Sequence, residues 1–233
     1  MGQSVENKRQ VREDLTRIME ASNPLGLSVN PEKCEIFIIP GAGREEIQSD
    51  TMGVLETIQK DMPKIKIVNR NNLLLLGAPI CEEAIEGVLL EKLQDLKRMA
   101  ERLTNIDAHD AVFLLKSCYA IPKLTYFLRS APTYRTMATL QEYDQVMKKC
   151  LEDIINIKLG QEAWTQSSLP VKQGGLSIRK ATDLALSAFL SSAFSSAHGA
   201  SALLSKWKTT LKFRRLLDLW KAQFSEDKEQ DLP

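Results

Sequence analysis

Hydrophobic residues recur every three to four positions along most of the chain beyond residue 80. This spacing gathers them on one face of an α-helix and leaves lysine, arginine and glutamate on the opposite face. It predicts two long amphipathic helices, over residues 85–103 and 137–159. The residues that form the two apolar stripes are Ile85, Leu89, Leu93, Leu96, Met99 and Leu103 in the first helix, and Leu140, Tyr143, Met147, Leu151 and Ile154 in the second.

Shorter helices are expected around these two. Asp107 is a good N-cap for a helix that runs to Tyr119. Pro122 should break or kink that helix, because proline lacks the N–H that a helix interior needs. A short helix around Phe127 follows, and a last helix is expected over residues 203–224.

The first 80 residues show a different pattern. Residues 5–22 have helical spacing that Pro24 and Gly26 end, and residues 35–39 form a short apolar run that predicts a buried strand. A helix is expected over residues 44–60. Residues 64–67 alternate with a period of two, and an Asn-rich turn separates them from the apolar residues 73–76, so a β-hairpin is predicted there.

Two further segments complete the predicted fold. Residues 161–180 read as an irregular connector with a Gln-Gly-Gly turn, and residues 181–197 are apolar nearly all round, which predicts deep burial. The expected fold class is α+β and mostly α-helical. A small helix-strand-hairpin segment occupies residues 1–80, a helical bundle occupies residues 81–224, and residues 225–233 are expected to be disordered.

The charge of the chain is balanced overall but unevenly distributed. Lys+Arg number 31 and Asp+Glu 30, giving a formal net charge of +1, so net charge does not argue for a nucleic-acid partner. Basic residues outnumber acidic ones about two to one between Lys116 and Lys180, and a second basic cluster spans residues 206–221. A basic face of this kind is the footprint of phosphate contact. Solvated helix faces explain the same charges.

Candidate catalytic groups are few. The two histidines, His109 and His198, are isolated from any residue that would complete a triad, so a structural role is favoured. Adjacent carboxylate pairs such as Glu152-Asp153 point in different directions on a helix and do not converge on a metal. No metal site is expected in this chain.

The four cysteines are dispersed in apolar settings and suggest neither a zinc site nor a disulfide framework; they are Cys34, Cys81, Cys118 and Cys150. The polar N-terminus lacks a signal-peptide pattern, and no apolar run approaches the length of a membrane span. An intracellular protein, cytoplasmic or nuclear, without a membrane partner is expected.

Five motifs, in order, resemble the C-terminal part of the reverse transcriptases of non-LTR (LINE-like) retrotransposons. They are GLSVNPEKCEIF (26–37), LLLLGAPI (73–80), YAIPKLTYFLRSAP (119–132), YDQVMKKCLEDIINIKL (143–159) and WTQSSLPVKQGGLSIRKATDLALSAFLSSA (164–193). In that family the first follows the catalytic strand turn, the second resembles the primer-grip hairpin, and the others belong to the helical region downstream. The resemblance covers about residues 10–195.

The resemblance implies a set of nucleic-acid-binding residues. Lys33 matches a lysine near the polymerase active site that is proposed to protonate the departing pyrophosphate, although a plain turn lysine explains it as well. Gly77 matches the glycine of the grip hairpin. Lys123 and Arg129, with aromatic neighbours, would contact phosphate and bases, or else snorkel over a core of aromatics. The further candidates in the downstream helical region are Lys172 and Arg179.

The resemblance also implies what the chain lacks. The fingers and the paired aspartates that bind Mg²⁺ in the complete polymerase have no counterpart in this sequence, so the chain is expected to be inactive alone. Its expected partners are an RNA or DNA primer-template, a separate palm and fingers polypeptide, or another protein. A helical protein-interaction module, using the apolar residues 181–197, is the alternative, and a product without a selected function is a third.

Overall fold

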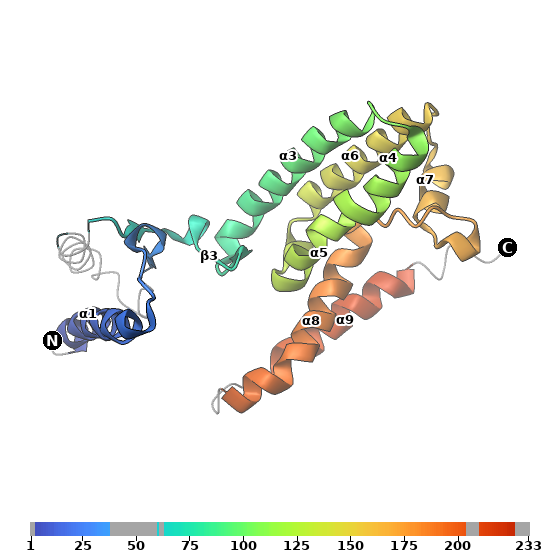
Figure 1. Ribbon diagram of the computed structural model, residues 1–233. Coiled ribbons are helices and arrows are strands. Elements are labelled where there is room, and N and C mark those ends of the chain that lie inside the picture. The colour runs from blue at the N-terminus through green and yellow to red at the C-terminus, as the bar shows by residue number, and fades with distance from the viewer. Residues whose placement is uncertain (1–2, 38–59, 61–62, 204–209, 227–233) are drawn as a thin grey trace. The chain divides into compact units, whose positions relative to one another are not determined.

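The computed structural model describes residues 3–37, 60, 63–203 and 210–226 (Figure 1). The fold is mostly helical with a few two-residue strands, so the expected α+β, mainly α-helical class is confirmed. Contacts within the chain divide it into two compact units, Met1–Leu73 and Leu74–Pro233, which are described separately below. The sequence analysis placed the boundary after residue 80. In the structure it falls after Leu73, so residues 74–80 belong to the second unit.

The first unit contains one long helix and a minimal parallel sheet. Helix α1 spans Gln3–Ser22 and is followed by a 3-10 turn, Asn23–Leu25, that Gly26 closes in a left-handed conformation (φ 71°). Strand β1 (Glu35–Ile36) pairs in parallel with β2 (Lys66–Ile67). The expected helix over residues 44–60 and the end of the strand at residues 38–39 lie outside the described residues, except for Lys60.

The predicted hairpin between residues 64–67 and 73–76 is wrong. Strand β2 pairs with β1, and β3 (Leu74–Leu75) pairs with β4 (Ala78–Pro79) across a two-residue turn. The alternation at residues 64–67 and the apolar run at residues 73–76 indicated strands but carried no information about their partners. The Asn-rich segment forms a 3-10 turn, Arg70–Asn72, whereas Leu76 and Gly77 both adopt positive φ (52° and 79°), as the tightest hairpin turns require.

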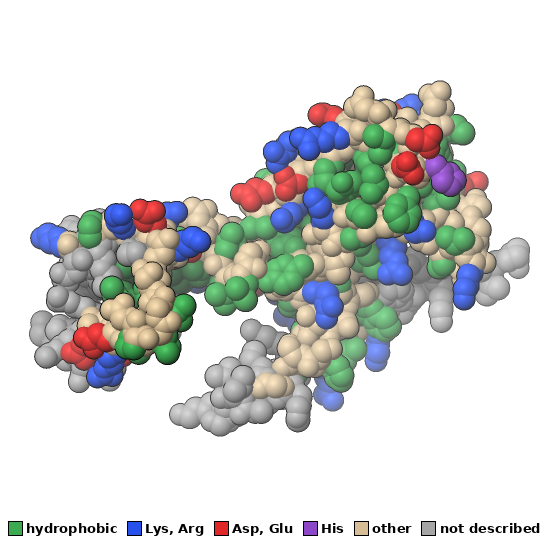
Figure 2. Space-filling view, in the orientation of Figure 1, with side chains coloured by type: hydrophobic (Ala, Val, Ile, Leu, Met, Phe, Trp, Pro, Cys, Tyr) green, Lys and Arg blue, Asp and Glu red, His purple; other side chains and the backbone are tan. Residues whose placement is uncertain are grey.

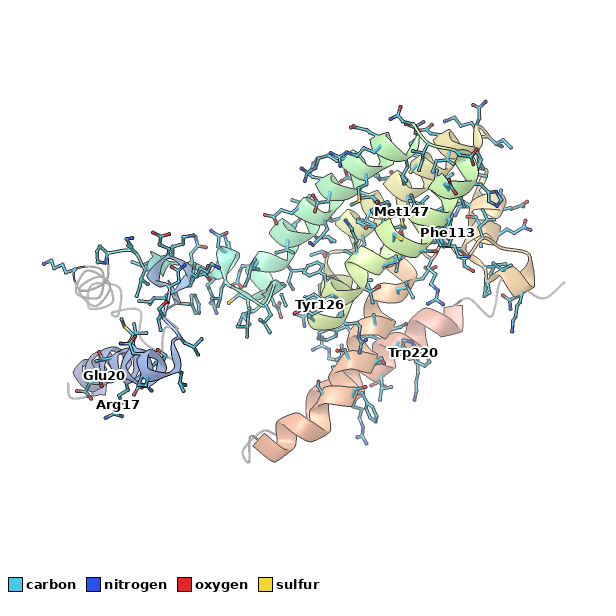
Figure 3. The ribbon with its side chains drawn as sticks, in the orientation of Figure 1. Arg17, Glu20, Phe113, Tyr126, Met147 and Trp220 are labelled. Atoms are coloured by element: carbon cyan, nitrogen blue, oxygen red, sulfur yellow. The ribbon has the colours of Figure 1, made fainter. Side chains whose placement is uncertain are left out.

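The core of the second unit lies between paired helices (Figure 1). Helix α3 (Ile85–Leu103) packs against α6 (Met137–Ile155), and α5 (Ile121–Ser130) packs against α8 (Ala181–Leu203). Most of both predicted apolar stripes is buried, which confirms the two long helices. The fully buried side chains include Leu89, Leu93, Leu96, Leu140, Met147 and Leu151, and Met147 lies among the helices in Figure 3.

The chain between α3 and α5 is helical but interrupted. The Asp107 carboxylate caps α4 (Ala108–Leu114) by accepting the His109 N–H at 2.9 Å, as predicted. A π-helical turn, Leu115–Tyr119, precedes Pro122 in the first turn of α5. At this break the buried Tyr143 hydroxyl donates to the Ala120 carbonyl at 3.0 Å, and burial raises the pKa of Tyr143.

The segment expected to be an irregular connector contains a helix, α7 (Gln161–Ser168), which buries Trp164. The sequence analysis missed this short helix because turn-forming residues follow position 168 and the whole segment was taken as irregular. The loop that follows folds back tightly, because Leu176 N–H and Ile178 N–H both donate to the Ser167 carbonyl at 3.1 Å. Gly175 is required here, since a Cβ at that position would lie 2.1 Å from the Leu169 carbonyl oxygen.

Deep burial of residues 181–197 is also wrong. Ala181, Ala185 and Leu186 are buried, but Phe194 is 72% exposed. Helix α8 has 23 residues and α5 has 10, so at 1.5 Å per residue α8 extends about 20 Å beyond what α5 can cover. Helix α9 (Thr210–Glu226) packs on α8 and its Trp220 Nε1–H donates to the Ser187 hydroxyl at 3.2 Å (Figure 3).

The last predicted helix therefore begins later and ends later than expected. Leu203 is the final residue of α8, and α9 continues to Glu226. The expected disordered tail begins at residue 225, and its residues 227–233 lie outside the described part of the chain.

Candidate nucleic-acid interface

A basic groove runs between the C-terminal half of α3 and the chain from α4 to the start of α5. It encloses about 600 Å³ and is lined by Asp95, Arg98, Met99, Arg102, Leu103, Ile106, Leu114, Tyr119 and Lys123. We refer to it as the α3–α5 groove. In Figure 2 basic side chains, with acidic ones among them, lie over α3 beside a band of hydrophobic side chains over α4 and α5. The groove therefore combines positive charge with apolar surface.

Lys123 lines this groove and contacts two of the other residues that line it. Its Nζ lies 5.2 Å from the centroid of the Tyr119 ring, which is cation–π geometry, and 3.5 Å from the sulfur of Met99. The π-helical turn places Tyr119 beside Lys123 although a proline separates them. The ammonium group of Lys123 is exposed and lines the groove, and it forms no ion pair with a carboxylate of the described residues.

Three cations line the groove and one of them is neutralised. Arg98 forms an ion pair with Asp95 on the same helix. Arg102 and Lys123 have no carboxylate partner within the described part of the chain. Two unpaired cations next to an aromatic ring form the pattern that contacts phosphate and base together in single-stranded nucleic-acid sites.

The aromatic residues around Pro122 divide into two groups. Phe127 is buried in the core, whereas Tyr119 is half-buried under Lys123 and Tyr126 is 54% exposed. The core interpretation is confirmed for Phe127, whereas nucleic-acid contact by the other aromatic residues stays a prediction. Phe127 is core, and Tyr119 belongs to the groove.

Gly77 lies in the hairpin turn between β3 and β4. Its φ of 79° explains the glycine, and a Cβ there would meet nothing within 4 Å, so close backbone approach does not explain it. The Tyr126 hydroxyl (Figure 3) donates to the carbonyl of Leu76, the residue before Gly77, at 3.0 Å. This bond ties the hairpin to α5, the helix that carries Lys123.

The other predicted residues of the second unit do not line the groove, and Lys33 belongs to the first unit. Lys33 is exposed in a 3-10 turn, Pro31–Lys33, of the first unit. Arg129 is exposed in the last turn of α5, and Lys172 is exposed in the turn Val171–Gln173. Arg179 lines a different pocket, described below. Within the second unit, the structure brings Lys123 into the groove but not Arg129, Lys172 or Arg179.

Two groove residues were missed by the sequence analysis. Arg98 and Arg102 were taken as part of the polar face of α3. A four-residue spacing of arginines on one helix face was the available signal, but the sequence does not reveal that α4 and α5 fold against that face.

The described residues offer no group of three or more His, Cys, Asp or Glu side chains that converges as a metal site requires. Within these residues, no set of side chains is assigned to the Mg²⁺ ions of a polymerase. All four cysteines are free thiols. Cys150 is buried, which raises its pKa to about 11, whereas Cys118 is exposed and not in the apolar setting expected for it.

One helical stretch in the described part of the chain, Ala108–Ser130, has the length and composition of a membrane span, with a mean hydropathy of 1.2 in its most apolar window. Core helices share these properties. In this stretch Leu115, Leu124 and Phe127 are buried within the bundle. The sequence analysis expected no apolar run of this length, so that expectation is wrong, but by itself the stretch is weak evidence for a membrane span.

The chain was compared with known families and proteins. No protein-family model matches it, and no curated protein and no solved structure matches it significantly.

Proposed function

We propose that this chain is the C-terminal part of a non-LTR retrotransposon reverse transcriptase, the end of the palm and the thumb-like helical region, and that it binds nucleic acid without polymerising. The observation that carries the proposal is the α3–α5 groove, where Lys123 stacks on Tyr119 beside Arg102. The groove contains part of the third of the five motifs that resemble this family. The protein acts inside the cell, in the cytoplasm or nucleus.

The proposed partner is an RNA or DNA strand of a primer-template. Arg102 and Lys123 contact its phosphates, and the groove's apolar wall accommodates a base. Nucleotide addition needs Mg²⁺ held by carboxylates, which a palm and fingers polypeptide would supply. Lys33 would gain a catalytic role only in such a complete polymerase.

Fluorescence anisotropy with labelled single-stranded RNA and with a primer-template duplex tests this proposal. The full chain should bind with a negative slope of log K against log salt, and Arg102→Gln/Lys123→Gln should lower the affinity about tenfold or more and reduce the slope. The matched control is Lys97→Gln/Lys149→Gln, which removes two lysines already paired with Glu142 and Asp153. Equal losses in the two double variants, or no binding by the unmodified chain, would overturn the proposal.

A second candidate function is a helical protein-interaction module. It is favoured by the apolar hairpin, in which Leu75 is 61% exposed, Leu76 is 88% exposed and Ile80 is 55% exposed. Hydrophobic side chains gather at this hairpin in Figure 2. Exposed apolar clusters of this kind mark contact surfaces more often than isolated exposed leucines do.

Sedimentation over a range of protein concentrations discriminates the two candidates. Self-association that Leu75→Thr abolishes, in a protein without affinity for the labelled strands, would support the interaction module. A monomer that binds the strands would exclude it as the main function.

A further inference from the structure

We propose that a second pocket, on the side of α5 formed by the π-helical turn and residues 177–179, binds a phosphate group. The pocket encloses about 400 Å³, and its polar lining residues are Lys116, Ser117, Thr125, Ser177 and Arg179. We refer to it as the Lys116 pocket. Its volume lies in the range of small-ligand sites, so it has room for a phosphate and part of the group that carries it.

The charge of the Lys116 pocket is the first argument. It is lined by two cations and no carboxylate, and neither Lys116 nor Arg179 has an ion-pair partner in the part of the chain that the structure describes. Several other basic residues of the bundle are paired, as Lys97 is with Glu142, although Arg102 and Lys123 are not among the described residues. Lys116 is half-buried, and a partly desolvated cation without a partner is costly unless an anion joins it.

The hydrogen-bonding groups are the second argument. The Thr125 hydroxyl donates to the Ile121 carbonyl at 2.8 Å, so its proton is already used. The hydroxyl groups of Ser117 and Ser177 have no partner among the described residues and remain able to donate. A phosphate offers several acceptor oxygens, which suit a lysine, two hydroxyls and the planar fork of an arginine.

The backbone of residue 177 is the third argument. Ser177 has a φ of 60°, which is uncommon for a residue other than glycine. Its N–H donates to the Leu169 carbonyl at 2.9 Å, and the flanking residues bond to Ser167, so the loop enforces this conformation. Such conformations persist where the surrounding structure fixes them and gather at binding sites.

The phosphate has two possible sources, a nucleic-acid strand or a small phosphate compound. A strand as the source rests on the proposed function, because it would extend from the α3–α5 groove past α5. The affinity of the Lys116 pocket for a phosphate group does not rest on it. The two sources therefore need separate probes.

The experiment uses the full chain, a labelled single-stranded oligonucleotide and inorganic phosphate observed by ³¹P line broadening. The test variant is Lys116→Gln/Arg179→Gln, and Lys97→Gln/Lys149→Gln is again the control with the same change of net charge. We expect the test variant to bind the oligonucleotide about tenfold more weakly and its salt slope to fall by about 1.4, because each single-strand phosphate contact contributes about 0.7. The control should stay within about twofold. Thermal unfolding checks that both variants are folded.

The outcomes separate the pocket from the proposed function. Unchanged oligonucleotide binding and unchanged ³¹P broadening in the test variant would refute phosphate binding by the Lys116 pocket. The proposed nucleic-acid function would remain. Lys116-dependent broadening without any oligonucleotide binding would support the pocket with a small phosphate compound as its source, and would overturn the proposed function. Equal losses in test and control variants would show an effect of net charge alone and would overturn the pocket.

Discussion

The carboxylate of Asp144 on α6 holds Thr182 at the start of α8. One oxygen accepts the Ala181 N–H at 2.6 Å, and the other accepts both the Thr182 N–H at 3.1 Å and the Thr182 hydroxyl at 2.7 Å. A side chain of one helix thus satisfies N–H groups that the beginning of another helix leaves free. Asp144 is buried, which raises its pKa in spite of these three bonds.

Replacing Asp144 should therefore destabilise the bundle more than replacing a surface carboxylate. Asp144→Ala leaves two N–H groups and a hydroxyl without their acceptor, and we expect a loss of about 2–3 kcal/mol in the free energy of unfolding. Urea denaturation measures it. Asp153→Ala, which breaks an exposed ion pair with Lys149, is the control and should cost less than about 1 kcal/mol. Similar losses in both variants would show that the cap is unimportant.

The position of Asp144 shows what the sequence could and could not predict. It lies four residues after Leu140 and three before Met147, on the buried face of α6, which is unusual for a charged residue and was an available signal. Periodicity predicted α3 and α6 and most of their buried residues, because burial of one helix face depends mainly on local spacing. The partner of Asp144, 37 positions along the chain, depends on tertiary packing and could not be predicted from spacing.

The same dependence on tertiary packing explains the other differences between the predicted and the observed fold. Strand pairing and the overhang of α8 are set by the relative lengths and positions of elements, which a hydrophobic pattern does not contain. Of the groove residues, Lys123 was identified through the resemblance, in a motif where aromatic residues lie around it. Arg102 was not, because it reaches the groove only when α3 packs beside the turn that carries Tyr119.

The turn at Gly77 provides a second test of the fold. Gly77→Ala places a Cβ in open space but at a φ of 79°, so it should destabilise the protein by about 1 kcal/mol through the backbone alone. Gly87 is the matched control, because it lies in α3 and its Cβ would also meet nothing within 4 Å. Gly87→Ala should stabilise by about 0.5–1 kcal/mol, since alanine favours helix. Opposite signs in urea denaturation support the turn, and the same sign for both contradicts it.

Glu152 should make the stability of the bundle depend on pH. Its carboxylate accepts the Leu159 N–H at 3.0 Å and pairs with Lys158 at 3.2 Å, and these bonds, the first above all, hold its pKa below the ordinary 4.5. A carboxyl group with a lowered pKa stabilises the folded state above its ordinary pKa and loses this effect as the pH falls through the folded value.

The measurement is the difference in thermal midpoint between the unmodified chain and Glu152→Gln across that range. The unmodified chain should be more stable near neutral pH, and the difference should shrink as the pH falls below about 4.5. Taking the difference cancels the contribution of Asp144, whose raised pKa acts in the opposite sense. A difference that is constant or grows on acidification would contradict the proposed role of Glu152.

Residues 81–224 should fold without the rest of the chain. The buried cluster that joins α3, α5, α6 and α8 draws all of its members from residues 85–185, so removal of residues 1–80 takes no side chain from it. It does take the hairpin, and with it the carbonyl to which the exposed Tyr126 hydroxyl donates. We therefore expect a cooperative thermal transition for residues 81–224, and a fragment of residues 74–226 that is more stable by about 0.5–1.5 kcal/mol.

Calorimetry on both fragments checks this. If only the longer fragment unfolds cooperatively, the hairpin is part of the folding unit, and if neither does, the prediction that the bundle folds alone is wrong.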